Sequence, residues 1–211
     1  MQTDLAFPQP LVEKYRPVRI ADFIGLERPK KVLSAFCKRP VSGAWLFIGP
    51  SGLGKSTMAL ALAAELDAEL HKIPSQKCNA QSIEDTVRRC WYAPMTPGSF
   101  HVVLADEADQ MTDAAQLALL SKLDSTDPAP NTIWVFTAND TERLERRFLS
   151  RCKVLEFSSY GLSEQIAAYL DSVWHAEGGY GNAPDLVRLA KDSRNNVRDC
   201  LMRLEVELMA L

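Results

Sequence analysis

The chain has 211 residues, of which 46% are hydrophobic and 24% are charged, and its formal net charge at pH 7 is −3. This length predicts one large domain, alone or with a small second one, and the composition is ordinary for a globular protein. No apolar run approaches the ~18–20 residues that cross a bilayer. The acidic net charge argues against a dedicated high-affinity DNA-binding protein, although a chain with this net charge can still have a local basic face.

The first residues, the cysteines and the histidines indicate the compartment and exclude some chemistry. The opening MQTDLAFPQP lacks the basic and apolar regions of a signal peptide. The five cysteines are odd in number and form no C-x-x-C pair, so we expect neither a disulfide framework nor a zinc site. His71, His101 and His175 are isolated in the sequence, and we expect no metal cluster and no Ser–His–Asp triad. A cytoplasmic protein is expected.

Short apolar runs alternate with helical patterns through most of the chain. The candidate strands are residues 44–49, 69–74, 101–106, 132–139 and 153–157. Their near-continuous Val, Ile, Leu and Phe is typical of strands buried on both faces of a parallel sheet. The candidate helices between them are residues 55–66, 83–92 and 113–123. Ser82 followed by Asp85 predicts a capping box for the second helix. The alternation predicts an α/β fold.

After residue 157 the pattern changes to helices alone. We expect amphipathic helices over residues 163–176, 184–190 and 196–211, with no strand between them. The sequence therefore predicts an α/β domain over residues 1–158 and a small helical domain over residues 159–211.

The strongest functional signal is GPSGLGKS at residues 49–56, which fits G-x-x-x-x-G-K-[ST] between a strand and a helix. The backbone N–H groups of such a loop bind phosphate oxygens. The alternative is a glycine-rich turn that fits the motif by chance, which is rare. Lys55 would reach the β- and γ-phosphates of a nucleotide, and the Ser56 hydroxyl would bind Mg²⁺. The expected nucleotide contacts are Gly49, Pro50, Ser51, Gly52, Leu53, Gly54, Lys55, Ser56 and Thr57.

Polar residues close two later strands. Asp106 and Glu107 follow the run HVVLA, at the carboxyl end where open α/β sheets bind ligands. Asp106 would hold Mg²⁺ and Glu107 would activate the attacking water, and the alternative is a solvated acidic turn. Asn139 would contact the γ-phosphate or position the water, or it simply forms a turn.

Several stretches together resemble the AAA+ ATPases, and more closely the small ATPase subunits of the replication factor C clamp loader. They are VEKYRPVRIADFIG at residues 12–25, DEADQMTDAAQLAL at residues 106–119, the spacing from Asn139 to Arg151 in SRC, and SRNNVRDCLMRLE at residues 193–205. The resemblance implies a parallel P-loop AAA+ sheet flanked by helices and followed by a three-helix lid. It also implies ATP and Mg²⁺ as cofactors and an active site shared between subunits.

The resemblance assigns roles to individual residues. The opening stretch lies beside the adenine in such proteins, which implies adenine contacts from Tyr15, Arg16, Pro17 and Ile24. Arg198 falls at the sensor-2 position of the lid. The implied catalytic set is Lys55, Glu107, Asn139, Arg151 and Arg198.

The arginines of RRFLSRCKVLEF, residues 146–157, repel one another and need a negative partner. In proteins that it resembles, the arginine of SRC points at the γ-phosphate bound by a neighbouring subunit, so Arg151 is expected to act in trans. The alternative is a solvated face on which Arg143, Arg146, Arg147 and Arg151 pair with Glu142 and Glu145.

DNA contact is a weaker expectation. Lys77, Arg88 and Arg89 flank the second candidate helix, in a region that faces DNA in related spirals, and would track phosphates. Trp91 and Tyr92 would stack on bases, and the alternative is that both are core aromatics beside ordinary surface charges.

The sequence departs from the clamp-loader pattern at three places. It ends at Leu211, so we expect it to lack the helical collar that follows the lid in such subunits. Leu120 and Ser121 stand where an arginine pair is usual, and Asn195 and Asn196 replace Gly-Asp before the lid arginine.

The expected function is that of an ATP-hydrolysing, clamp-loader-like subunit acting as an oligomeric ring or spiral on DNA, in replication. A sliding clamp or another recruited protein would be its partner, and no membrane is expected. The alternative is a regulatory AAA+ ATPase whose spiral or filament recruits a partner, as in helicase loading or transposition. A catalytically quiet subunit is a third option, and the intact Lys55, Asp106 and Glu107 argue against it.

Overall fold

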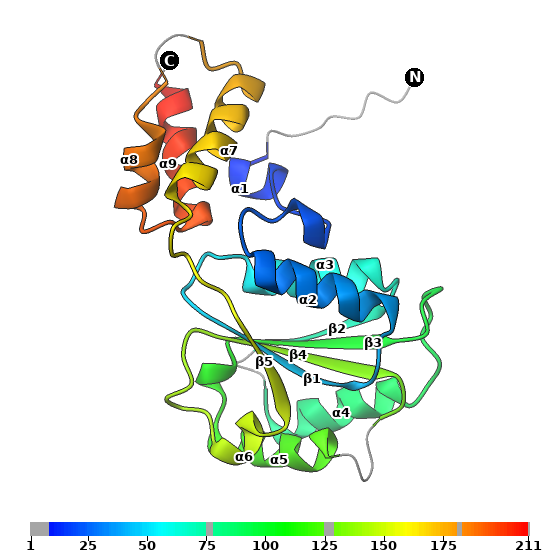
Figure 1. Ribbon diagram of the computed structural model, residues 1–211. Coiled ribbons are helices and arrows are strands. Elements are labelled where there is room, and N and C mark those ends of the chain that lie inside the picture. Colours follow the sequence, from blue (N-terminus) through cyan, green and yellow to red (C-terminus); the bar gives the residue numbers. More distant parts are fainter. Residues whose placement is uncertain (1–8, 75–77, 125–128, 181–182, 211) are drawn as a thin grey trace. The chain divides into compact units, whose positions relative to one another are not determined.

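The computed structural model describes residues 9–74, 78–124, 129–180 and 183–210, and it divides into two compact units (Figure 1). One unit spans Pro17–Ser158, and the other combines the described residues up to Arg16 with those after Ser158. The α/β unit therefore begins at Pro17, whereas the sequence-based domain began at residue 1. The early residues group with the helical unit because the Leu11 N–H donates to the Glu205 carboxylate at 3.1 Å.

A five-stranded parallel sheet forms the centre of the α/β unit, as the α/β pattern predicts, with the strand order β2-β3-β4-β1-β5. The strands are β1 (Gly43–Ile48), β2 (Glu69–Pro74), β3 (His101–Asp106), β4 (Thr132–Ala138) and β5 (Cys152–Glu156). Every residue of β4 is buried, whereas the edge strands β2 and β5 each bury one residue. The continuous apolar runs thus mark the central strands.

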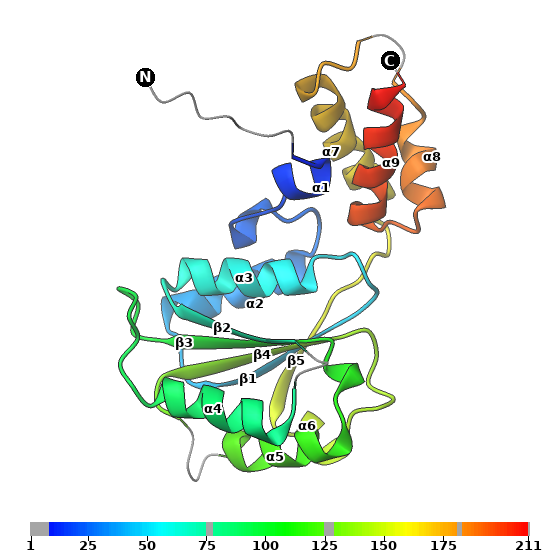
Figure 2. The same cartoon turned by 180° about the vertical axis from the view of Figure 1, so that it is seen from behind.

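Two helices cover one face of the sheet (Figures 1 and 2), namely α2 (Glu27–Lys38) and α3 (Lys55–Glu65), with the short 3-10 helix η1 (Ile20–Asp22) beside them. Their core includes Leu33, Phe47, Met58 and Leu62. The sequence analysis did not predict α2, although Val32, Leu33, Phe36 and Cys37 form an apolar stripe that packs against this core.

The opposite face is covered by α4 (Ala80–Cys90), α5 (Asp113–Leu123) and α6 (Arg146–Leu149), with the 3-10 helix η3 (Ala108–Gln110) after β3 (Figures 1 and 2). The capping box predicted from Ser82 and Asp85 is wrong. Asn79 caps α4 instead: its side chain accepts the Ser82 N–H, and the Ser82 hydroxyl accepts the Asn79 N–H. The first buried apolar residue of α4 is Ile83, one turn inside the helix, and the sequence analysis therefore began the helix at Ile83 instead of Ala80.

The helical unit contains α1 (Leu11–Lys14), α7 (Ser163–Ala176), α8 (Leu186–Asp192) and α9 (Val197–Met209). Asp185 and Asn196 cap α8 and α9 by accepting backbone N–H groups. Trp174 is buried in this unit, and Trp45 and Trp134 are buried in the other. None of the described helices is long and apolar enough to cross a membrane.

Candidate nucleotide-binding site

The loop between β1 and α3 has a backbone that needs glycine at two positions. Gly49 has φ +149°, and a Cβ there would lie 2.1 Å from the Phe157 carbonyl oxygen. Gly54 has φ +80°, and a Cβ there would lie 2.9 Å from the Phe23 ring. Both glycines therefore let the loop pass close to neighbouring chain while it keeps a left-handed turn at the start of α3.

Lys55 is the buried cation of this loop. Its ammonium donates to the carbonyl oxygens of Gly49 at 2.5 Å and Pro50 at 2.9 Å, and to the Asn139 side-chain oxygen at 3.2 Å. Only 8% of Lys55 is exposed. The fold thus brings together two residues 84 positions apart, because β1 and β4 are neighbouring parallel strands. Three oxygens hold the positive charge at the centre of the loop.

The predicted metal ligands also meet. The Ser56 hydroxyl donates to Asp106 Oδ1 at 2.5 Å, joining the first turn of α3 to the end of β3. A hydroxyl and a carboxylate are hard oxygen ligands of the kind that Mg²⁺ prefers, so this donor set fits the ion.

Thr137 is part of the same network, and the sequence analysis missed it. Its hydroxyl donates to Asp106 Oδ1 and accepts the Glu107 N–H at 3.0 Å. A polar residue near the carboxyl end of the buried run of β4 is the signal that could have pointed to it. Thr137 orients the Asp106 carboxylate and pins the backbone where the chain leaves β3.

Glu107 is exposed and sits at φ 55°, ψ 51°. The left-handed region is uncommon for a residue with a side chain and concentrates at functional turns. Successive side chains along a strand point to opposite faces of the sheet, and the turn at Glu107 ends this alternation. The carboxylates of Asp106 and Glu107 therefore both lie at one edge of the sheet.

Arg151 lies at the other end of the sheet. It directly precedes β5, whose register pairs Cys152 with Ala44 at the start of β1. The phosphate loop begins at Gly49, five residues beyond Ala44, which corresponds to roughly 17 Å of strand. Arg151 is therefore too far away to touch a phosphate in the loop of its own chain.

The immediate partner of Arg151 is a carboxylate of the same chain. One guanidinium nitrogen donates to Asp124 at 3.0 Å, and another donates to the Arg147 carbonyl at 2.9 Å. Because 31% of the Arg151 side chain and 44% of that of Asp124 are exposed, we expect the ion pair to contribute no more than about 1 kcal/mol. In the following residue, burial raises the pKa of the Cys152 thiol to about 12, so the thiol is inert.

Gln116 fixes the chain that leads to Arg151. It is 1% exposed, its amide donates to the Arg143 carbonyl, and its side-chain oxygen accepts the Glu145 N–H, both at 2.9 Å. The side chains of Arg143, Arg146 and Arg147 are exposed, as the solvated-face alternative expects for them.

The predicted adenine contacts and Arg198 are divided between the two units. Pro17 and Ile24 belong to the α/β unit, and Tyr15, Arg16 and Arg198 to the helical unit. Within the helical unit, the Tyr15 hydroxyl donates to Glu177, and burial together with this bond raises the pKa of Tyr15 to about 12. Arg16 pairs with Glu13 at 2.6 Å. Arg198 is exposed on α9.

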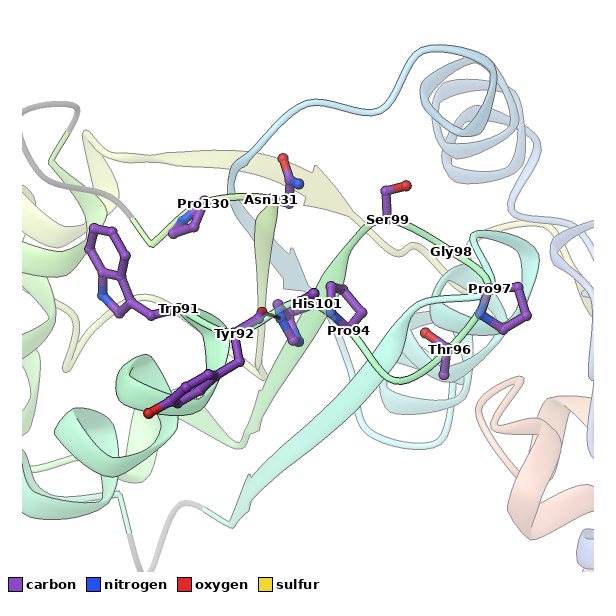
Figure 3. A pocket seen from close by; sticks show the side chains of 11 residues that line it. Trp91, Tyr92, Pro94, Thr96, Pro97, Gly98, Ser99, His101, Pro130 and Asn131 are labelled. Carbon is purple, nitrogen blue, oxygen red and sulfur yellow. Dashed lines mark hydrogen bonds between the residues drawn. The ribbon is translucent and has the colours of Figure 1, made fainter.

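The residues considered for DNA lie on and after α4. Arg88 and Arg89 are exposed in its last turn, and Lys77 lies outside the described residues. Trp91 and Tyr92 are 54% and 74% exposed, so the alternative that they are core aromatics is wrong. Both line a pocket of about 420 Å³, together with Pro94, Pro97, His101 and neighbouring residues (Figure 3).

The expectation of isolated histidines is wrong for two of the three. His71 Nε2 and His101 Nδ1 are 3.0 Å apart, and Cys90 lies beside them. The pair is invisible in the sequence, because the residues come from two strands 30 positions apart.

The fold and the phosphate loop define a P-loop ATPase of the AAA class. The sequence profile of the "ATPase family associated with various cellular activities (AAA)" matches residues 45–160, more than half of the chain. The chain therefore belongs to the AAA family, as the resemblance predicted.

Within this family the chain is similar to small subunits of replication factor C. It is 37% identical over 153 residues to small subunit 1 of Pyrobaculum islandicum, covering 69% of this chain and 46% of the relative. It is 31% identical over 201 residues to small subunit 2 of Pyrobaculum aerophilum, covering 92% of this chain and 62% of the relative. The chain thus spans about half to three fifths of the length of these relatives.

Solved structures of the same fold include RuvB of Thermotoga maritima. One mutant form of RuvB superimposes with a TM-score of 0.76 at 20% identity, covering 91% of this chain and 65% of that one. The structure described as "RuvB Holliday junction branch migration motor" gives a TM-score of 0.74 at 24% identity, covering 93% of this chain and 65% of that one. At this identity the likeness establishes the shared AAA fold.

Proposed function

We propose that the chain binds ATP with Mg²⁺ and hydrolyses it as a clamp-loader-like subunit that acts as an oligomer on DNA, in replication. The observation that carries the ATP chemistry is the convergence of Lys55, Ser56 and Asp106 around one phosphate loop. The similarity to replication factor C small subunits supports the cellular role.

ATP binding would exchange acceptors around Lys55. Its ammonium has three donors, which now meet two backbone carbonyls and the Asn139 amide oxygen. Phosphate oxygens are charged and make stronger hydrogen bonds to an ammonium group than these neutral oxygens do. Asn139 would then be released to contact the γ-phosphate or the attacking water.

Hydrolysis would be divided among the residues at the carboxyl ends of β3 and β4. Mg²⁺, held by Ser56 and Asp106, would neutralise phosphate charge when bound. Glu107 lies next to Asp106 and is exposed to solvent, which suits a base that takes a proton from water. Thr137 keeps the Asp106 carboxylate oriented while these steps occur.

Arg151 would complete the site of a neighbouring subunit. It lies at the opposite end of the sheet from its own phosphate loop, and its exposed ion pair with Asp124 is weak enough to exchange for a γ-phosphate. An arginine supplied in this way makes hydrolysis depend on assembly. Arg198 would contribute a lid cation to its own site, and Tyr15, Arg16, Pro17 and Ile24 would contact the adenine.

The ATP assignment is tested with Lys55→Ala. The variant should bind ATP at least ~100-fold more weakly, because the loop loses its buried cation while its backbone keeps the same fold. Lys72→Ala, at an exposed position of β2, is the matched control and should bind like the unmodified chain. Titration with a fluorescent ATP analogue measures both. Unchanged affinity in Lys55→Ala would remove the basis of the proposal.

A regulatory AAA+ ATPase that recruits another protein is a second candidate. It is favoured by an apolar stripe on α9, where Met202, Val206 and Met209 are 46%, 63% and 78% exposed. Their spacing places them on one face of the helix, where a partner could dock. ATP hydrolysis measured with primer–template DNA, with and without a sliding clamp, separates the two functions. Stimulation that requires the clamp supports clamp loading, and stimulation by DNA alone favours the regulatory role.

A further inference from the structure

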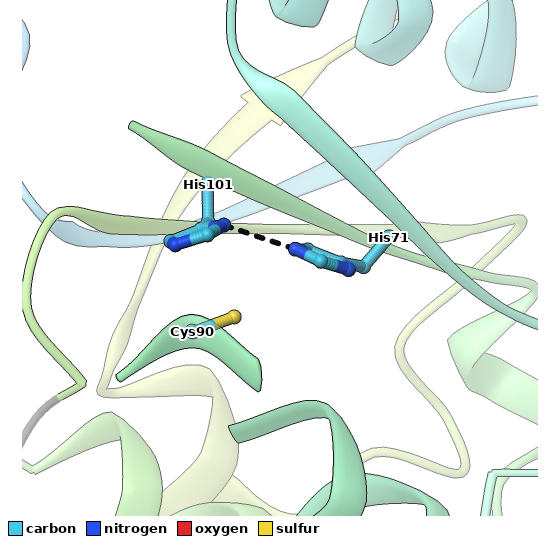
Figure 4. A group of neighbouring side chains, drawn as sticks. All are labelled: His71, Cys90 and His101. Atoms are coloured by element: carbon cyan, nitrogen blue, oxygen red, sulfur yellow. Dashed lines mark hydrogen bonds between the residues drawn. The ribbon is translucent and has the colours of Figure 1, made fainter. Parts of the chain in front are cut away.

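Two histidines and a cysteine converge near the start of β3, on the face of the sheet that α4 covers (Figure 4). The donor atoms of His71, Cys90 and His101 all lie within 4.8 Å of one another. His101 is 2% exposed, Cys90 is fully buried, and 10% of the His71 side chain is exposed. None of these residues belongs to the nucleotide site.

The fold explains this meeting. Strands β2 and β3 are parallel, and their register places Glu69 opposite His101. Because side chains alternate along a strand, Glu69 and His71 point to the same face as His101. Helix α4 packs on that face and buries Ile83, Val87 and Cys90 against it. Two strands and one helix thus bring the three donors together, with the Glu69 carboxylate beside the two histidines.

We propose that His71, Cys90 and His101 form a binding site for a transition-metal ion of the Zn²⁺ class. Neutral imidazole and thiolate are the ligands that Zn²⁺ prefers, and three of them are already gathered here. The site would be structural, because it ties the edge strand β2 to β3 and to the end of α4.

The spacing of the ligand atoms suits a tetrahedral ion. With Zn–N bonds of about 2.1 Å, two tetrahedral nitrogen ligands lie roughly 3.4 Å apart. His71 Nε2 and His101 Nδ1 are 3.0 Å apart and share one proton in a hydrogen bond. As a metal ion binds to His71 Nε2, the shared proton moves to the other ring nitrogen of His71, Nδ1, so that both imidazoles stay neutral, and the two rings separate by a few tenths of an ångström. The thiol would release its proton to solvent as the thiolate binds.

The surroundings of His101 resemble those of a metal ligand. Its other ring nitrogen, Nε2, lies 2.9 Å from the Tyr92 carbonyl oxygen. That contact makes Nε2 the protonated nitrogen and leaves the Nδ1 lone pair facing His71 and Cys90. His101 and Tyr92 also line the pocket after α4 (Figure 3), which gives solutes a route towards this corner of the sheet.

Glu69 provides the fourth ligand. Its carboxylate oxygens lie 3.9 Å from His71 Nε2 and 3.8 Å from His101 Nδ1. One of them also accepts the Met95 N–H at 2.7 Å, which orients the group. A carboxylate supplies the negative charge that, with one thiolate, neutralises a divalent ion.

The test uses Co²⁺ as a spectroscopic substitute for Zn²⁺, added to the purified chain without nucleotide. The proposal expects one equivalent to bind, with the visible bands of tetrahedral Co²⁺ and a near-ultraviolet thiolate-to-cobalt charge-transfer band. Zn²⁺ should displace the Co²⁺. It should also raise the melting temperature by roughly 5–10 °C when free Zn²⁺ exceeds the dissociation constant about 100-fold.

Cys90→Ser identifies the sulfur. It should lose the charge-transfer band and at least ~100-fold of the affinity for Zn²⁺, because the loss of even an outer-shell partner costs about 10–100-fold. Cys78→Ser is the matched control: Cys78 is a buried cysteine that donates to Met111 Sδ, and its variant should keep the band. Lys55→Ala should also keep it, which separates this site from the nucleotide site.

Two results would overturn the site. The first is the absence of a charge-transfer band in the unmodified chain, and the second is its persistence in Cys90→Ser. Should Cys90→Ser fail to fold, His71→Ala replaces it, since His71 lies on the edge strand β2 and is the least buried of the three residues. Zn²⁺ affinity in a folded His71→Ala equal to that of the unmodified chain would equally refute the proposal, and would leave the histidines as a hydrogen-bonded pair.

Discussion

The two ends of the central sheet carry different chemistry. At the carboxyl ends of the strands, the oxygens of Ser56, Asp106 and Thr137 form a hydrogen-bonded network, and the Lys55 ammonium lies in the same phosphate loop. At the amino ends lie Arg151 and the buried cluster around His101. Loops diverge at the carboxyl ends of parallel strands and leave a crevice. At the amino end of β3, the chain after α4 lines a pocket with His101 and Asn131. One end suits the chain's own nucleotide, and the other faces outward.

The difference has a consequence for hydrolysis. Every group proposed to bind ATP in the α/β unit lies at one end, while the cation proposed to stabilise the transition state lies at the other. A single chain then has an ATP site that lacks the arginine of a neighbour, and an arginine (an arginine finger) that has no ATP of its own to contact. Assembly would join the amino end of one sheet to the carboxyl end of the next.

The largest expected effect is that of Arg151→Ala. ATP hydrolysis should fall by ~10³–10⁵, because each γ-phosphate loses the arginine supplied by its neighbour. ATP affinity should stay near normal, since Lys55, Ser56 and Asp106 are untouched. Arg147→Ala, an exposed neighbour on α6, is the control and should retain most activity. Steady-state hydrolysis and equilibrium ATP binding measure the two quantities.

Mixing two inactive variants shows whether the arginine acts between chains. In an assembly of Arg151→Ala with Glu107→Gln, some interfaces combine the intact Glu107 of one chain with the intact Arg151 of the other. Activity should return at those interfaces. An arginine that served its own chain would give no recovery on mixing, once co-assembly of the two variants has been demonstrated.

The second effect is that of Glu107→Gln at the carboxyl end. Hydrolysis should slow by about 10²–10⁴, because a general base contributes that much, while ATP and Mg²⁺ still bind. Glu142→Gln, an exposed glutamate beyond β4, should behave like the unmodified chain. Single-turnover hydrolysis with saturating ATP is the measurement. Unchanged turnover in Glu107→Gln would mean that another group activates the water.

The sequence predicted most of the carboxyl end and little of the amino end, for a physical reason. The phosphate loop and Asp106 with Glu107 are local signals, each written in one strand and the residues after it. The cluster of His71, Cys90 and His101 depends on strand register and on how α4 docks, which no short stretch of sequence contains. Thr137 was missed likewise, because its partner Asp106 lies on the neighbouring strand.

A third, smaller effect compares the two ends of one strand. Thr132 and Thr137 are both buried on β4, at opposite ends. Thr137→Val removes the donor to Asp106 and the acceptor of the Glu107 N–H, so it should cost about 1–3 kcal/mol of stability and slow hydrolysis as well. Thr132→Val removes a bond to the Pro130 carbonyl and should lower stability alone.

Thermal unfolding and hydrolysis measured on both threonine variants give the comparison. Thr137→Ser keeps the hydroxyl and should restore most of the lost activity. An equal loss of hydrolysis in Thr132→Val and Thr137→Val would show that the two ends of the sheet are not functionally separate.

The smallest effect concerns the acceptor that holds Arg151 in the isolated chain. Asp124 competes with a neighbour's γ-phosphate for the same guanidinium, through a half-exposed pair that contributes no more than about 1 kcal/mol. Asp124→Asn should therefore change the melting temperature little. It should make Arg151 easier to transfer to a neighbour, and so lower the protein concentration that gives half-maximal hydrolysis by up to about fivefold, the factor that 1 kcal/mol allows.

Asp124→Asn should thus raise hydrolysis at low protein concentration, whereas Arg151→Ala should lower hydrolysis. The two variants therefore distinguish release of Arg151 from its loss. Hydrolysis measured across a dilution series gives the midpoint for both chains. A midpoint shifted to higher protein concentration would mean that Asp124 positions Arg151 for its neighbour and does not compete for it.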